Sequence, residues 1–221
     1  MTEEVAASGS SRVLDPIDRV SEVLFGLFMV LTFTGTLSVV DSGRDEVRDM
    51  LVAAIGCNLA WGFVDGVMYV LRNIVARGRK ARLLQDVRAA DRPEQAHRLI
   101  ADEIGRLATA IGVEGLERVR RFAVAQPAED EQAARVTWPD LRGAAAVFLL
   151  VFLSTFPVVL PFVFIADPGL AKRVSAAVAI AMMFVCGWAW GRYAGARPWR
   201  TGTVMVLLGT IVEAIIIALG G

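Results

Sequence analysis

The distribution of charge along the chain is the feature that most restricts its fold. The 23 basic and 23 acidic residues balance to a formal net charge of zero, yet residues 77–140 alone carry 12 Lys or Arg and 11 Asp or Glu. Much of the remaining chain is apolar, with 55% hydrophobic residues and a mean hydropathy of +0.53 overall. This segregation is typical of membrane-spanning helices joined by a hydrophilic piece. It predicts an all-α integral membrane protein that contacts the lipid bilayer.

Five apolar stretches are long enough to cross a bilayer as helices. A hydrocarbon core of about 30 Å takes roughly 20 apolar helical residues, because every backbone polar group must be satisfied within the segment. We expect transmembrane helices at Val20–Val40, Met50–Leu71, Leu141–Ile165, Val174–Trp190 and Thr201–Leu219. The chain is thereby divided into a polar N-terminal tail (1–19), spans one and two (20–76), a hydrophilic insert (77–140) and spans three to five (141–221).

The insert between spans two and three has helical periodicity. We expect three helices, at about Arg79–Ala90, Pro93–Ala110 and Glu114–Val124, followed by a solvated linker over residues 127–136. Pro93 suits a first helical turn with Asp91 as its cap, and the region of Gly112 suits a stop. The insert is too short for a separate enzyme domain but long enough for a three-helix cap.

Positive charges near the span ends predict the topology. An N-terminus in the cytoplasm would place on that side Arg12, Arg19, the Arg77–Arg82 cluster, Arg142 and the loop with Arg192, Arg197 and Arg200. The opposite side would hold Arg44, Arg48, Lys172 and Arg173. The excess of positive charge on the first side predicts that the N-terminus and the insert are cytoplasmic and that the C-terminus lies on the opposite side.

Ionisable residues inside the expected spans point to an ion path. A charge near the bilayer centre costs at least ~2.5 kcal/mol on insertion scales, so such groups usually face a protein interior or a water-filled path. Glu22, Asp65 and Glu213 fit that description, and Asn58 lies two turns before Asp65 on the same helix face. With Met68, these residues offer carboxylate, amide and thioether ligands suited to Mn²⁺ or Fe²⁺.

Each of these residues also has a simpler interpretation. Glu22 would then sit at headgroup level, Asp65 would bond a neighbouring helix, and Met68 would only pack. Pro157 and Pro161 are expected to kink span three, and such kinks border a cavity or merely bend a packing helix.

The insert offers a second candidate metal site. Glu94 and His97 form an E-x-x-H pair on one helix face, which is the spacing used in carboxylate di-metal proteins. A salt-bridged surface with an exposed histidine is the alternative. The chain has no phosphate-binding loop, no Ser-His-Asp set and no HExxH motif, which lowers the expectation of an ATP-driven pump or a hydrolase. Because the insert's basic residues lack interleaved aromatic residues, we do not expect nucleic acid as a partner.

Short segments in three spans resemble those of one transporter family. They are Arg19–Gly26 with its Ser21-Glu22 pair, Phe152–Ser154 followed by Pro157 and Leu160–Phe162, and Val174–Ala176 followed by Phe184, Gly187, Gly191 and Gly195. Together with the layout of two spans, a helical insert and three spans, these segments resemble the vacuolar iron transporter family, which moves Fe²⁺ or Mn²⁺ out of the cytosol.

The resemblance carries further implications. It implies a homodimer with a metal path between first spans, exchange of metal against protons, Glu22 as the first-span ligand, and an insert that gathers metal. Two segments depart from the family pattern. Where the family has a methionine ligand in span two, this chain reads Gly56–Gly62, and Asp86 is the one acid on Arg79–Ala90, so that Glu94 and His97 would stand for the second-helix pair.

Three functions therefore compete. The leading one is secondary transport of Fe²⁺ or Mn²⁺ by a protein that is not an enzyme and has no prosthetic group, with the intramembrane carboxylates as ligands. The second is a non-transporting multi-span membrane protein with a structural or regulatory role, whose acids mediate helix association. The third is a membrane-bound metal enzyme that uses Glu94 and His97, for which one E-x-x-H pair supplies too few ligands unless a dimer completes the site.

Overall fold

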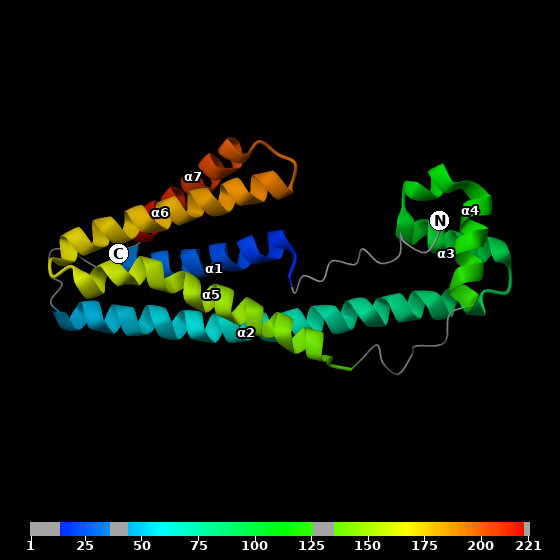
Figure 1. Cartoon of the computed structure of the whole chain (residues 1–221), viewed down its shortest axis with the longest axis horizontal. Coiled ribbons are helices and arrows are strands. Elements are labelled where there is room, and N and C mark those ends of the chain that lie inside the picture. The colour runs from blue at the N-terminus through cyan, green and yellow to red at the C-terminus, as the bar shows by residue number, and fades with distance from the viewer. Residues whose placement is uncertain (1–13, 36–43, 126–134, 219–221) are drawn as a thin grey trace, which may run out of the picture. The chain divides into compact units, whose positions relative to one another are not determined.

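A computed structural model describes residues 14–35, 44–125 and 135–218 (Figure 1). These residues form seven helices and no strand, which confirms the all-α class. The helices are α1 (Pro16–Gly35), α2 (Arg44–Ala89), α3 (Pro93–Ile104), α4 (Leu107–Ala125), α5 (Trp138–Phe164), α6 (Pro168–Tyr193) and α7 (Pro198–Ala218). Most of the expected N-terminal tail and of the linker at 127–136 lies outside the described residues.

Three of these helices are long and apolar enough to cross a membrane. By length and composition, the described residues give candidate spans in Asp45–Ala89, Trp138–Phe164 and Pro168–Tyr193. The sequence predicted two further spans, which correspond to α1 and α7. Helix α1 carries Asp18, Arg19 and Glu22 within its first seven residues, so every 18-residue stretch of this 20-residue helix contains all three charged side chains.

The chain divides into two compact units, and the first combines residues 1–69 with residues 141–221. In this unit α6 packs against α7, and both contact α1. Its core includes Leu27, Leu31, Val158 and Met183, which are almost fully buried. Burying such aliphatic side chains together fixes the helices against one another, because packing contacts between helices add up over many atoms.

Glycines let the helices of this first unit approach closely. A methyl group added to Gly66 of α2 would lie 3.0 Å from the carbonyl oxygen of Ala144 in α5, and one added to Gly187 of α6 would lie 2.7 Å from that of Thr201 in α7. Small residues at such crossings are a common device of membrane helix packing. Gly66 and Gly187 therefore lie at helix contacts.

The second unit covers Val70–Asp140 and contains the insert. Its hydrophobic cluster unites the C-terminal part of α2 with α3 and α4 through Val87, Ala96, Ile100, Leu116 and Ala123. Because this cluster takes one apolar stripe from each of three helical segments, the hydrophilic insert has a small core of its own.

The insert helices differ from the predicted ones in two respects. The separate helix expected at Arg79–Ala90 is instead the continuation of α2, because no proline interrupts the change from apolar to charged residues and the single Gly78 is tolerated within the helix. The helix expected from Pro93 to Ala110 ends at Ile104, since Gly105 takes a positive φ of 58°. The expected stop near Gly112 is confirmed, since Gly112 takes a non-helical φ of 63° and ψ of −175° and interrupts α4 at that position.

The start of α3 also differs in one detail. Pro93 does begin the helix, as predicted. The N-cap position, however, is Arg92 and not Asp91, and no side chain there caps the helix. In contrast, α6 begins with a full cap: Leu170 N donates to Asp167 Oδ2 at 2.8 Å, and Pro168 occupies the first turn.

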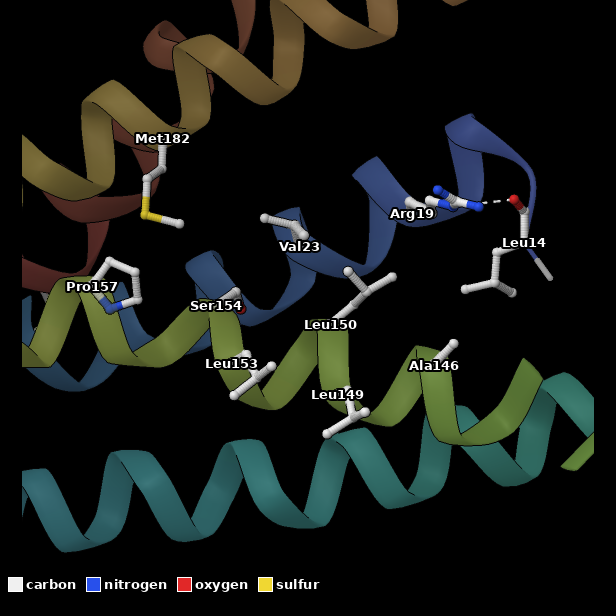
Figure 2. Close-up of a pocket in the computed structure, with 10 residues that line it drawn as sticks. All are labelled: Leu14, Arg19, Val23, Ala146, Leu149, Leu150, Leu153, Ser154, Pro157 and Met182. Atoms are coloured by element: carbon white, nitrogen blue, oxygen red, sulfur yellow. Dashed lines mark hydrogen bonds between the residues drawn. The ribbon is translucent and has the colours of Figure 1, made fainter. Parts of the chain in front are cut away.

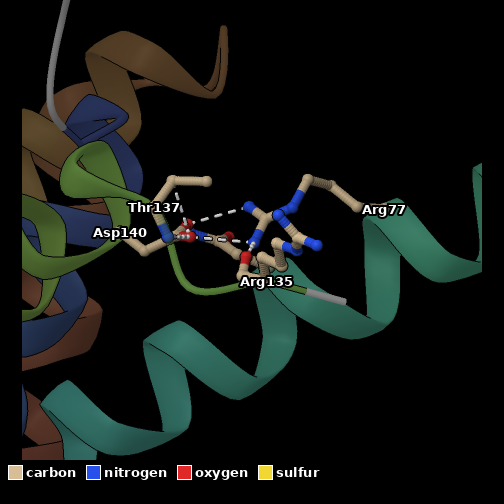
Figure 3. Close-up of polar contacts among 5 residues, drawn as sticks. Arg77, Arg135, Thr137 and Asp140 are labelled. Atoms are coloured by element: carbon tan, nitrogen blue, oxygen red, sulfur yellow. Dashed lines mark hydrogen bonds and ion pairs between the residues drawn. The ribbon is translucent and has the colours of Figure 1, made fainter. Parts of the chain in front are cut away.

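A buried carboxylate ties α2 to the start of α5 within the second unit (Figure 3). Arg77 donates from Nη1 and Nη2 to the two oxygens of Asp140, at 2.9 and 2.8 Å, and Asn73 Nδ2 donates to Oδ1 at 3.1 Å. The backbone N–H and hydroxyl of Thr137 donate to Oδ2 at 2.9 and 2.8 Å, and the bond from the backbone N–H is one half of a capping box. Asp140 is 2% exposed, so this charge is both buried and well satisfied.

Candidate metal path

A cavity of about 240 Å³ lies between α1, α2 and α5 in the first unit. Its lining combines apolar and aromatic side chains with one carboxylate, that of Asp65 in α2, and one thioether, that of Met29 in α1. Phe25, Phe28 and Val151 contribute apolar walls, with Trp61 one turn before Asp65. A carboxylate and a sulfur atom in an otherwise apolar chamber form a small ligand set of mixed hardness.

Asn58 lies two turns before Asp65 and is completely buried. Its Nδ2 donates to Gly26 O of α1 at 3.3 Å and to Thr155 Oγ1 of α5, so one amide joins three helices. Its Oδ1 receives no hydrogen bond within the part of the chain that the structure describes. The amide therefore fixes the helix junction through its nitrogen and retains one oxygen that can coordinate a cation or accept a hydrogen bond from water.

Glu22 is the buried acid of α1, with only 5% of its surface exposed. It precedes Gly26 by one turn and Met29 by two turns, so all three lie toward one side of the helix. Gly26 is where α1 meets α5, because a methyl group added there would lie 2.6 Å from Val151 O. Glu22 is therefore inside the helix bundle rather than at its periphery.

Two predicted ligands lie away from this cavity. Met68 is 48% exposed and is not among the residues that line it, although it follows Asp65 by only three positions. Glu213 of α7 is half-buried and does not line it either. Metal binding by Met68 and by Glu213 stays a prediction. Neither residue lines the cavity that contains Asp65.

In the insert, His97 contacts an acid from the next helix. Its Nε2 lies 2.9 Å from Glu117 Oε2 of α4, while Glu94 on its own helix is exposed. Glu117 also accepts from Nε and Nη2 of Arg120, each at 2.8 Å, and pairs with Arg121 at 3.4 Å. Arg120 above all, together with His97, lowers the pKa of Glu117 to about 2.

This arrangement bears on the metal site expected at Glu94 and His97. Within the described ranges, no group of three or more His, Cys, Asp or Glu is arranged to hold a metal ion. A metal at Nε2 of His97 would have to displace Glu117, which two arginines also hold. The contact expected of a salt-bridged surface is therefore present, except that His97 is half-buried rather than exposed.

Sequence reasoning missed Met29 and Trp61 as lining residues. Met29 had a usable signal, since it follows Glu22 by seven residues and so shares its side of α1. The sequence signal for Trp61 was weaker: it precedes Asp65 by four residues, one turn of α2. Neither signal states which of several methionines reaches the acid, which depends on how α1 crosses α2.

The apolar helices and the polar groups buried between them define an integral membrane protein. Comparison with known families gives a match to the VIT family over residues 78–221. The chain therefore belongs to the VIT family, the vacuolar iron transporters, whose general activity is transport of metal ions across membranes. No curated protein matches the chain. The matched residues include the insert and α5 to α7, whereas Glu22, Met29 and Asp65 precede them.

Proposed function

We propose that this protein is a secondary transporter that moves Fe²⁺ or Mn²⁺ out of the cytosol in exchange for protons. The observation that carries the proposal is the cavity between α1, α2 and α5, where Asp65 and Met29 line one chamber. The carboxylate attracts a divalent cation, and the thioether favours a transition metal over Mg²⁺ or Ca²⁺, which prefer oxygen ligands alone. Because the cavity offers only two ligands, it also allows the metal ion to dissociate, which transport requires.

The carboxylates give a route for coupling to protons. A carboxylate in an apolar site binds either a cation or a proton, because the charge is costly there without a partner. Asp65 in the cavity and Glu22 on the neighbouring helix are the two groups that would exchange metal for protons. Asn58 would hold α1, α2 and α5 in register around them through its contacts with Gly26 and Thr155.

One subunit supplies few ligands to this cavity. A first-row divalent ion takes about four to six ligands, so one carboxylate and one thioether leave positions for water or for a second copy of the chain. We therefore propose a homodimer, as the family resemblance implies. The same proposal places five spans in the bilayer, the N-terminus and insert in the cytoplasm and the C-terminus on the opposite side, in agreement with the positive charges.

Uptake into proteoliposomes tests the function. We expect Fe²⁺ or Mn²⁺ uptake that requires a pH gradient and that falls at least about tenfold in Asp65→Asn, since ~1.4 kcal/mol of lost ion stabilisation already gives that factor. Glu22→Gln should lose the dependence on the gradient. Uptake of neither ion by well-folded protein would refute the proposal and favour the non-transporting membrane protein.

A methionine pair on neighbouring helices provides the matched control. Met29→Leu removes the sulfur atom from the cavity with little change of volume, whereas Met68→Leu does the same at an exposed position outside it. Met29→Leu should raise the half-saturating metal concentration several-fold, and Met68→Leu should behave as wild type. Equal effects of the two substitutions would show that the cavity is not the metal path.

A further inference from the structure

A second and larger cavity, of about 500 Å³, lies between α1, α5 and α6 (Figure 2). Eight of its ten lining residues are apolar, and the two exceptions are Ser154 and Arg19. The Ser154 hydroxyl is already used, since it donates to Val151 O at 2.7 Å. Arg19 is thus the one side chain of this lining whose N–H groups can still donate to a ligand.

The charge and the apolar walls lie at opposite ends. Figure 2 shows Arg19 beside Leu14 at one end of the cavity, with Pro157 and Met182 at the other. Arg19 is exposed, its Nε donates to Leu14 O at 3.2 Å, and none of the ion pairs found in the described part of the chain includes it. Its position in the first turn of α1 also falls at the start of the first predicted span.

These features restrict the chemical class of the occupant. The volume suits a molecule of ligand size, for which pockets of about 300–1,000 Å³ are usual. The apolar lining offers ordered water few hydrogen-bond partners, so ordered water alone is a poor occupant. A hydrophilic metabolite would find a single polar anchor. A flexible hydrocarbon chain with an anionic group at one end matches both the apolar walls and the terminal cation.

We propose that this cavity binds an anionic phospholipid of the surrounding bilayer, with an acyl chain along Leu150, Leu153 and Met182 and the headgroup phosphate on Arg19. The guanidinium of Arg19 presents N–H groups suited to a phosphate, and a basic residue at a membrane surface attracts anionic lipid. No residue that lines this cavity also lines the candidate metal path, so the lipid proposal can be tested independently of the transport proposal.

Lipid titration of the full-length protein in detergent tests this assignment. Native mass spectrometry would compare binding of phosphatidylglycerol and phosphatidylcholine to wild type, Arg19→Gln and Arg142→Gln. Arg142 is an exposed arginine of α5 that does not line the cavity, so it is the matched control. We expect Arg19→Gln to weaken phosphatidylglycerol binding about fivefold and to weaken phosphatidylcholine binding less, because the choline cation offsets the charge of its phosphate. Arg142→Gln should match wild type.

A second variant tests the hydrocarbon part of the site. Ala146→Phe adds a ring to the cavity wall and should reduce the bound fraction of both lipids. Should this variant fold poorly, phosphatidylglycerol with a diazirine-labelled tail gives the same information on wild type, with cross-links expected on α5 at residues 149–154. Labelling spread evenly over the exposed residues of α7 would overturn the proposal.

Two other results would also overturn it. Equal loss of phosphatidylglycerol binding in Arg19→Gln and Arg142→Gln would mean that general surface charge attracts the lipid, without a site. A changed oligomeric mass of Ala146→Phe with unchanged lipid binding would identify a second copy of the chain as the occupant.

Discussion

The buried ion pair of the second unit allows a sharp prediction. Replacing Arg77 by methionine keeps the aliphatic part of the side chain and removes both hydrogen bonds to Asp140. The carboxylate would keep the donors from Thr137 and Asn73 but lose its positive partner while only 2% exposed. Leaving one member of a buried pair uncompensated usually costs 3–5 kcal/mol, and we expect ~3 kcal/mol because the Arg77 side chain is 33% exposed.

This free energy corresponds to a measurable change in melting temperature. For a chain of this size, ~3 kcal/mol lowers Tm by roughly 6–12 °C. Differential scanning fluorimetry of the detergent-solubilised protein would measure it. Arg79→Met on the same helix is the control, since Arg79 and Glu103 form an exposed pair at 2.9 Å whose loss should shift Tm by less than about 2 °C.

A double-mutant cycle separates the ion pair from ordinary packing. Asp140→Asn should destabilise wild type but restore part of the stability of Arg77→Met, because the neutral amide no longer buries an unpaired charge. Additive effects of the two substitutions would refute the reasoning, as would a Tm of Arg77→Met within about 1 °C of wild type.

Two further predictions concern the helix contact at Gly26 and the pH dependence of the insert. Gly26→Ala should lower Tm by several degrees, because the added methyl group would lie 2.6 Å from Val151 O. Gly56→Ala is the control: its methyl group would have nothing within 4 Å, so Tm should stay unchanged or rise slightly. Equal shifts of Tm in a thermal scan of the two variants would contradict the close contact at Gly26. The pKa of Glu117 is depressed from 4.5 to about 2, so its stabilisation of the α3–α4 contact should be complete above pH 4.5 and lost as pH falls toward 2. Hydrogen exchange of α3 and α4, corrected for intrinsic rates, should show this loss in wild type, and an identical pH profile in Glu117→Gln would exclude the mechanism.

The sequence predicted the elements of the fold better than their ends. Hydropathy and periodicity suffice for the all-α class and for a helix beginning at Pro93, since both follow from local composition and from the fixed φ of proline. The expectation of a separate helix at Arg79–Ala90 was wrong for a physical reason. A change from apolar to charged residues marks a change of environment, but arginine, lysine and alanine are good helix formers, so α2 continues to Ala89.

For the candidate site too, the sequence predicted some features and could not predict others. Sequence spacing placed Asn58 and Asp65 on one face of α2, and the cost of burying charge was enough to make Glu22 and Asp65 candidates. Sequence could not choose between Met68, three residues from Asp65, and Met29 on another helix. The crossing of α1 and α2 decides which thioether lines the cavity, and it gives that place to Met29.

The sequence by itself therefore determined the membrane class, the helical insert and the acids that need a protein interior, because hydropathy and the cost of buried charge act residue by residue. Only the tertiary structure decided which groups meet: Met29 and Asp65 at one cavity, His97 with Glu117, and Arg77 with Asp140. Such pairs join positions that are not neighbours in the sequence, so their contacts depend on how the helices pack against one another.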